Sequence, residues 1–192
     1  MSSRRGWISI LLISLVALFP SSLAAGLFDW FRIPKDEQAV NDLLGRVAKS
    51  LVKRHPLRVI GTGVAMPEGD LRMLGLQFQI RGPLTKAELR AITIDCVRVF
   101  LSHVNADEKV RPSLNHYPFS IEDLGMSIFV MDLTGRAVEA PNIRVVNLLK
   151  GDLVYRILQN DEDDMPVTKE EIIESYAEAL EAMKRDQEGS DQ

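Results

Sequence analysis

Hydrophobic residues recur along the chain at two spacings, and each spacing predicts one type of secondary structure. Between Val40 and Leu51 they lie three or four positions apart, which is typical of a helix with one buried face. Pro34 opens this helix, at a position where its missing N–H costs nothing, and His55-Pro56 ends it. Between residues 74 and 80 apolar and polar residues alternate, as they do in a strand with one face buried.

Two strands are predicted over residues 57–66 and 71–82, and the turn sequence Pro-Glu-Gly-Asp between them makes the pair a hairpin. Gly61-Thr62-Gly63 lies within the first of these strands. It lacks the third glycine and the following helix of a phosphate-binding loop, so we expect its glycines to be structural.

The second predicted helix runs from Thr85 to about Val104 and is the central helix of the fold. Thr85 and Glu88 form a capping box, in which each side chain satisfies a backbone N–H of the other residue. The apolar face, which includes Phe100, is broad enough to be buried against a sheet. Cys96, the only cysteine, lies on this helix, so no intramolecular disulfide can form and its thiol is expected to be buried.

Three further strands are predicted over residues 126–132, 143–149 and 152–158, the last two joined by a tight Lys150-Gly151 turn. An acidic loop follows at residues 160–164. The spacing Thr168-x-x-Glu171 fits a second capping box and predicts a final helix from Thr168. Its inner face is expected to carry Ile172, Tyr176, Leu180 and Met183.

The predicted order is therefore α-β-β-α-β-β-β-α. Strands joined by hairpins, with helices between and after them, indicate an α+β fold with a mostly antiparallel five-stranded sheet and helices packed mainly on one face. We expect residues 34–185 to form this single domain and residues 186–192 to be an acidic tail that frays. A chain of 192 residues with 46% hydrophobic and 26% charged residues is typical of one packed domain.

The charge is unevenly distributed along the chain. The formal net charge is -4, which gives no indication of a nucleic-acid partner. Residues 161–192 contain 12 acidic and three basic side chains. We expect this acidic end to be a solvated helix face and tail rather than a docking surface for a basic partner.

Residues 1–24 are predicted to form a secretory signal peptide. Arg4-Arg5 precedes an apolar run, Trp7–Phe19, that is too short to span a bilayer as a helix. Ser22 and Ala24 supply the small side chains that precede a cleavage site. The pattern predicts an exported protein of bacterial type, periplasmic or secreted.

Residues 25–33 form an aromatic arm after the predicted cleavage site. Phe28, Trp30 and Phe31 are of the types that favour the membrane–water boundary, so membrane contact through them is one interpretation. The arm is short and lacks a basic face, so we favour the other interpretation, in which it packs on the domain.

The sequence predicts neither a metal site nor a cofactor. The three histidines are His55, His103 and His116. No pair of them has the i, i+4 spacing that places two ligands on one helical face. No Gly-x-Ser-x-Gly motif occurs, and a triad of His116 and Asp123 with a neighbouring serine (Ser113 or Ser120) is too local for the required geometry.

The segment from Arg111 to Phe119 concentrates proline, asparagine, histidine and aromatic residues. Loops on a rigid scaffold often carry function, and the candidate binding residues are Arg111, Asn115, His116 and Tyr117. The alternative, which we favour, is that Tyr117 and Phe119 pack into the core while a proline fixes the turn. In either case His116 is expected to point away from the core.

The run from Arg111 to Phe119, followed by Met126-Ser127-Ile128-Phe129, Asp132-x-x-Gly135 and Pro141-Asn142-Ile143, resembles a group of small exported bacterial proteins of uncharacterised function. In that group a similar Arg-Pro…Tyr-Pro-Phe element precedes a strand, an Asp/Gly turn and a final hairpin. The resemblance implies export and a helix-then-strands order. It implies no activity, cofactor or catalytic residue.

These patterns together indicate an exported, non-enzymatic protein that binds a protein partner or an envelope component. One alternative is a small hydrolase with its site near His116. The other is a peripheral envelope protein anchored through Leu27–Ile33.

Overall fold

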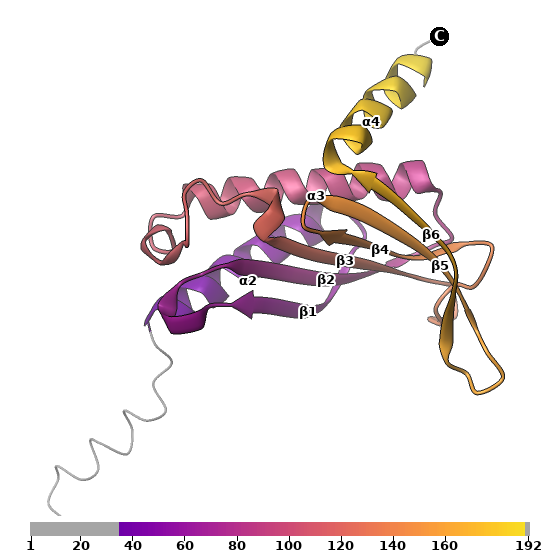
Figure 1. Ribbon diagram of the computed structural model, residues 1–192, viewed down its shortest axis with the longest axis horizontal. Helices are drawn as coiled ribbons and strands as arrows, with labels where there is room; N and C mark the ends of the chain where they lie inside the picture. Colours follow the sequence, from indigo (N-terminus) through magenta and orange to yellow (C-terminus); the bar gives the residue numbers. More distant parts are fainter. Residues whose placement is uncertain (1–34, 191–192) are drawn as a thin grey trace, which may run out of the picture. The chain divides into compact units, whose positions relative to one another are not determined.

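The computed structural model describes residues 35–190, which form an α+β fold built on one six-stranded mixed sheet (Figure 1). The elements in chain order are α2 (Lys35–Arg54), β1 (Arg58–Ala65), β2 (Met73–Arg81), α3 (Lys86–Ala106), β3 (Leu124–Met131), β4 (Ile143–Leu149), β5 (Asp152–Asn160), β6 (Pro166–Ser175) and α4 (Tyr176–Ser190). The predicted signal peptide and aromatic arm lie outside the described residues. No helix within residues 35–190 is long and apolar enough to cross a membrane.

The strands lie in the sheet in the same order as in the chain, from β1 to β6. Neighbouring strands are antiparallel except β2 and β3, which pair in parallel from Leu74↔Leu124 to Arg81↔Met131. The parallel pair arises because α3 carries the chain back along the sheet, so that β3 starts at the same end as β2. The prediction of an α+β fold is confirmed, but the predicted sheet of five strands is wrong.

The sixth strand replaces the first part of the predicted final helix. Residues 166–175 pair with β5 in an antiparallel hairpin, and α4 begins only at Tyr176. The capping box of α4 is formed by Ser175 and Glu178. The Glu178 N–H donates to Ser175 Oγ at 3.2 Å, and the Ser175 N–H donates to Glu178 Oε2 at 2.8 Å. The Thr168-x-x-Glu171 spacing therefore occurs within a strand.

The core lies between one face of the sheet and the helices α2 and α3. The predicted apolar stripe of α2 is buried, and its members are Val40, Leu43, Leu44, Val47 and Leu51. On α3 the Phe100 ring is fully buried, as the breadth of that helix's apolar face predicts. Alternate residues of β2 and β3 complete the same cluster, including Phe78 and Ile128.

The opposite face of the sheet, called here the outer face, carries a connected row of polar side chains. Asn147 Nδ2 donates to Ser127 Oγ at 2.8 Å, and Arg156 Nη1 donates to Asn147 Oδ1 at 2.7 Å. Arg156 Nε also donates to Glu171 Oε2 at 2.6 Å, so the row runs from β3 to β6. Each polar group in the row is satisfied by its neighbour on the next strand.

Candidate functional site

The segment between α3 and β3 is held against the start of β2 by backbone hydrogen bonds. The Leu71 N–H donates to the Ser113 carbonyl at 2.7 Å, and the Asn115 N–H donates to the Leu71 carbonyl at 3.0 Å. These two bonds form a short parallel bridge between Leu71 and Leu114. The candidate residues Arg111 to Tyr117 are therefore carried on a loop that is tied to the sheet.

Two side-chain clamps fix the far half of this loop. Asn105, in the last turn of α3, donates from Nδ2 to the Phe119 carbonyl at 3.0 Å and accepts at Oδ1 from the Phe119 N–H at 2.7 Å. Ser120 donates from its backbone N–H and its hydroxyl to Asp123 Oδ2, at 2.9 and 2.7 Å. Because both clamps satisfy backbone groups, the loop is ordered without regular secondary structure.

Phe119 and Tyr117 lie in different environments. The Phe119 side chain is buried, as predicted, whereas Tyr117 is 56% exposed, so the prediction that both rings face the core is wrong for Tyr117. The prediction assumed an extended segment, in which residues two apart share a side. Residues 115–118 instead form consecutive bends, so this alternation does not apply.

The exposed Tyr117 ring is held in place by Arg111 and by the end of α3. The Arg111 guanidinium carbon lies 4.8 Å from the centroid of the Tyr117 ring, which is a cation–π distance. Arg111 Nη2 and the Tyr117 hydroxyl both donate to the Asn105 carbonyl, at 3.3 and 3.4 Å. The two exposed side chains thus form a preordered pair on the surface.

His116 is exposed, as predicted, and both of its ring nitrogens have partners. Nε2 lies 2.9 Å from Asp123 Oδ2, and Nδ1 lies 3.0 Å from the Pro118 carbonyl. Since both partners are acceptors, the contacts fit the protonated ring, and the hydrogen bond to Asp123 raises the pKa of His116. Burial raises the pKa of Asp123, but hydrogen bonds from Ser120 and His116 outweigh it and leave that pKa below its usual value.

The arrangement of Ser120, Asp123 and His116 differs from that of a nucleophilic site. The Ser120 hydroxyl donates to Asp123, and the Asp123 carboxylate lies between the serine and the histidine. An activated serine needs its hydroxyl on the histidine, with the carboxylate behind the ring. The three side chains therefore fix the loop and do not form a relay for proton transfer.

A second polar centre, called here the Glu174 cluster, was not predicted. Glu174 on β6 accepts two hydrogen bonds from the Arg90 guanidinium, at 2.9 and 3.1 Å, and one from the Tyr155 hydroxyl at 2.6 Å. Lys86 Nζ lies 3.0 Å from Glu174 Oε2, and Arg90 also donates to Asp186 of α4 at 3.1 Å. All of these side chains come from α3, β5, β6 and α4, so the cluster joins the four elements.

The pKa shifts in the Glu174 cluster are those of a buried carboxylate whose charge is balanced by its hydrogen-bond donors, which is typical of a structural cluster. Burial raises the pKa of Glu174, but the hydrogen bonds from Arg90, Tyr155 and Lys86 outweigh it and lower that pKa to about 2. Burial, followed by the bond to Glu174, raises the pKa of Tyr155. The sequence signal that could have found this cluster is Arg90, a cation within the broad apolar face of α3, because a buried cation needs an anionic partner.

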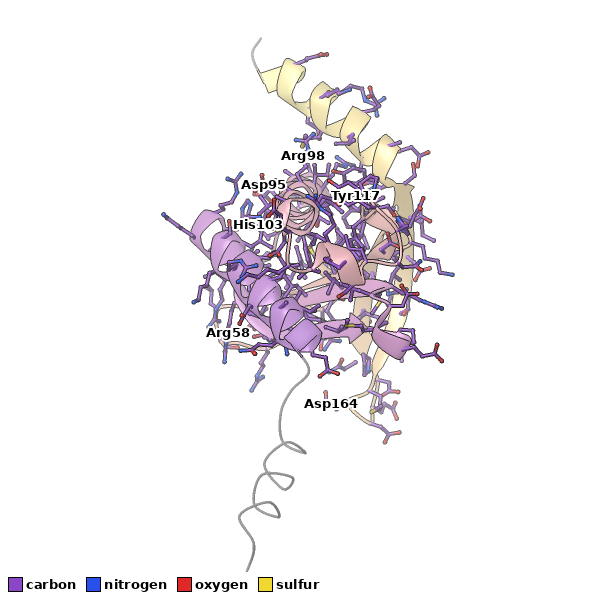
Figure 2. All side chains as sticks on the ribbon, turned by 90° about the vertical axis from the view of Figure 1, so that its left-hand side faces the viewer. Arg58, Asp95, Arg98, His103, Tyr117 and Asp164 are labelled. Carbon is purple, nitrogen blue, oxygen red and sulfur yellow. The ribbon has the colours of Figure 1, made fainter. Side chains whose placement is uncertain are left out.

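The other two histidines lie apart from His116. His55 Nε2 contacts Asp95 Oδ2 at 2.7 Å, and Asp95 also accepts two bonds from Arg54, which joins the end of α2 to α3. His103 bonds through Nδ1 to the Val99 carbonyl of its own helix, and Asp95 and His103 both project from α3 (Figure 2). Among residues 35–190, no three His, Cys, Asp or Glu side chains converge closely enough to hold a metal ion.

The structure therefore brings the four candidate residues onto one exposed loop, with Arg111 and Tyr117 in direct contact and Asn115 and His116 between them. Cys96 is buried, and its burial raises the pKa of the thiol to about 12, so the thiol is not ionised at neutral pH.

No protein-family model matches the chain, and no curated protein or solved structure matches it either.

Proposed function

We propose that the protein is an exported, non-enzymatic binding protein that holds a protein partner on the loop between α3 and β3. The observation that carries this proposal is the position of Tyr117. Tyr117 is 56% exposed, although the neighbouring Phe119 already fills the core beneath the loop. A large aromatic side chain that contributes little to the core is available for contact with another molecule.

The composition and order of the loop suit a binding surface. Tyrosine and arginine are enriched among the residues that contribute most to protein–protein affinity. Arg111 and Tyr117 are held by each other and by the Asn105 carbonyl, so little conformational freedom remains to be lost on binding. Asn115 and His116, both exposed, add polar groups next to this pair.

Export is part of the proposal and is supported by the sequence of residues 1–24. A basic start, an apolar run of 13 residues and small residues before Ala25 together favour secretion to the periplasm or beyond. The partner is therefore expected among proteins of the cell envelope. N-terminal sequencing of the protein from its native source should begin at Ala25 or Gly26, whereas an intact Met1 in the cytoplasmic fraction would contradict export.

The binding surface can be tested by cross-linking in envelope extracts followed by affinity recovery. Tyr117→Ala should lose the protein recovered with the wild type, and Arg111→Ala should weaken that recovery, while the melting temperature of each variant changes little. Leu133→Ala is the matched control, because Leu133 is a large apolar side chain with 85% exposure on a different loop. If Tyr117→Ala recovers the same protein as the wild type, the loop is not the binding surface.

A further inference from the structure

A small cavity of about 140 Å³ lies where β1 begins and where β2 and β3 end. Arg58, Gln79 and Arg81 form its polar wall, and Pro56, Ile80 and Met131 contribute apolar surface. Arg58 is the neighbour of Gln79 across the β1–β2 pair, and Arg81 is the neighbour of Met131 across β2 and β3. Both arginines thus project from adjacent strands into one space.

Half of the other arginines within residues 35–190 pair with an acidic side chain, whereas these two do not. Five arginines pair with a carboxylate, and these are Arg46, Arg54, Arg72, Arg90 and Arg156. Within residues 35–190, no carboxylate pairs with Arg58, and Arg81 has only the carbonyl oxygen of Asp132, which accepts from its Nη1 at 2.5 Å. None of the described residues that line the cavity is acidic.

The carboxylate of Asp132, whose backbone carbonyl contacts Arg81, is already occupied by its own turn. The Asp132 carboxylate accepts from the Thr134 hydroxyl and N–H at 2.7 and 2.8 Å, and from the Arg136 N–H at 2.9 Å. These bonds direct it toward the turn that follows β3. Two guanidinium groups on neighbouring strands repel each other, so an anion between them would stabilise the arrangement.

We propose that this cavity binds a phosphate group, either as the free ion or as a monoester. Phosphate carries a charge of about -1.5 to -2 at neutral pH and three acceptor oxygens on a monoester. Two guanidinium groups and the Gln79 amide match both the charge and the number of acceptors, whereas a carboxylate is matched by a single arginine. The volume of the cavity suits one such group and leaves the rest of an ester outside.

This site is distinct from the loop proposed to bind a protein partner. Leu71, which contacts that loop, precedes β2, whereas Arg81 ends it, and nine residues of strand span about 30 Å. The phosphate site can therefore be tested without disturbing the loop.

The test is a titration of the full chain with inorganic phosphate at constant ionic strength, followed by NMR of the arginine Nε–H groups and the Gln79 amide. Saturable shifts are expected at Arg58, Gln79 and Arg81. Arg58→Gln should weaken binding about tenfold or more, because it removes one charge-assisted contact, and Arg81→Gln should do the same. Within residues 35–190 the Arg58 side chain is exposed and forms no hydrogen bond or ion pair, so this variant remains informative even if Arg81→Gln fails to fold.

The controls separate a site from general attraction of anions. Arg185→Gln, at an exposed arginine of α4, should leave phosphate binding unchanged. Tighter binding of glycerol 3-phosphate than of phosphate assigns the site to a monoester, and equal affinity assigns it to the free ion. Shifts at Arg72 and Arg185 as large as those at Arg58, unchanged binding by Arg58→Gln, or equal binding of acetate would each overturn the proposal.

Discussion

At the scale of the residue, the loop between α3 and β3 divides its aromatic side chains between packing and exposure. Phe119 lies in the core, where Asn105 holds its backbone on both sides. Tyr117 lies on the surface, where its contacts are to Arg111 and to a backbone carbonyl. The hydrogen bonds of Asn105 therefore order the loop that carries the exposed Tyr117, and no further apolar side chain has to be buried for this.

Because Phe119 is buried and Tyr117 is exposed, their alanine substitutions should lower the free energy of unfolding by different amounts. Phe119→Ala should destabilise the fold by about 3–5 kcal/mol, because it leaves a cavity in a closed core. Tyr117→Ala should change the free energy of unfolding by about 0.5 kcal/mol or less, as exposed substitutions usually do. Denaturant melts of both variants measure this, and equal losses would show that Tyr117 is a core residue.

The contact between His116 and Asp123 predicts a dependence on pH. The folded-state pKa of His116 is raised above the unfolded value of about 6.5, so its stabilising effect is fully present below that value. The effect is lost as the pH rises through the folded pKa. His116→Gln should therefore destabilise the protein more at pH 5.5 than at pH 8.5, measured as the difference in unfolding free energy from the wild type.

The contact between His116 and Asp123 can also be tested by a substitution at Asp123. In Asp123→Asn the pKa of His116, followed by NMR, should fall toward its ordinary value because the carboxylate that raises it is gone. An unchanged pKa would show that the two side chains do not interact in solution.

At the scale of the element, β6 and α4 show where pattern-based prediction fails. The spacing of Thr168 and Glu171 matches a capping box, but pairing with β5 determines the structure of that segment. The pairing of residues 166–175 with β5 depends on contacts across the two strands, which the Thr-x-x-Glu spacing within one segment cannot report. By contrast, α2, α3, the β1–β2 hairpin and the Lys150-Gly151 turn were predictable, because periodicity, caps and turn residues specify them locally.

The two candidate caps of α4 can be compared directly. Ser175→Ala should destabilise the protein by about 1 kcal/mol, because the Glu178 N–H loses its acceptor. Thr168→Ala should have a smaller effect, since Thr168 is an exposed strand residue. Thermal melts of the two variants give the comparison, and a larger loss for Thr168→Ala would place the helix start where the sequence alone predicted it.

The Glu174 cluster joins elements that no local pattern connects. Glu174→Gln should cost about 3–5 kcal/mol, because it leaves the buried Arg90 cation without its main counter-charge. Since the pKa of Glu174 is lowered from 4.5 to about 2, its contribution should be complete above pH 4.5 and should decline progressively as the pH falls from there toward 2. Denaturant melts of wild type and variant between pH 3 and pH 7 test both statements, with Glu170→Gln on the exposed part of β6 as the control.

At the scale of the whole molecule, the candidate site was predictable as a location but not as an arrangement. The density of Asn, His, Tyr and Arg between residues 111 and 117 identified the loop. Which ring is buried depended on bends that follow from contacts with Leu71, far earlier in the chain, and with Asn105 in the last turn of α3. The proximity of Arg58 and Arg81, which have no carboxylate partner within residues 35–190, could not be predicted either, because only the sheet brings them together.

The strand order of the sheet has a mechanical consequence. Since β1 to β6 follow chain order, the first and last strands lie at opposite edges and are not paired with each other. Four of the five neighbouring strand pairs are antiparallel, so β1 and β6 run in the same direction, and the start of β1 and the end of β6 lie at opposite ends of the strands. Once α2 and α4 have been pulled away, a force on the two ends of the domain therefore acts along the strands and loads the hydrogen bonds of each edge strand together, in shear. In an optical trap the domain should therefore lose its terminal helices first and then resist until the sheet yields at higher force, so a machine that pulls on either end meets its main resistance at an edge strand.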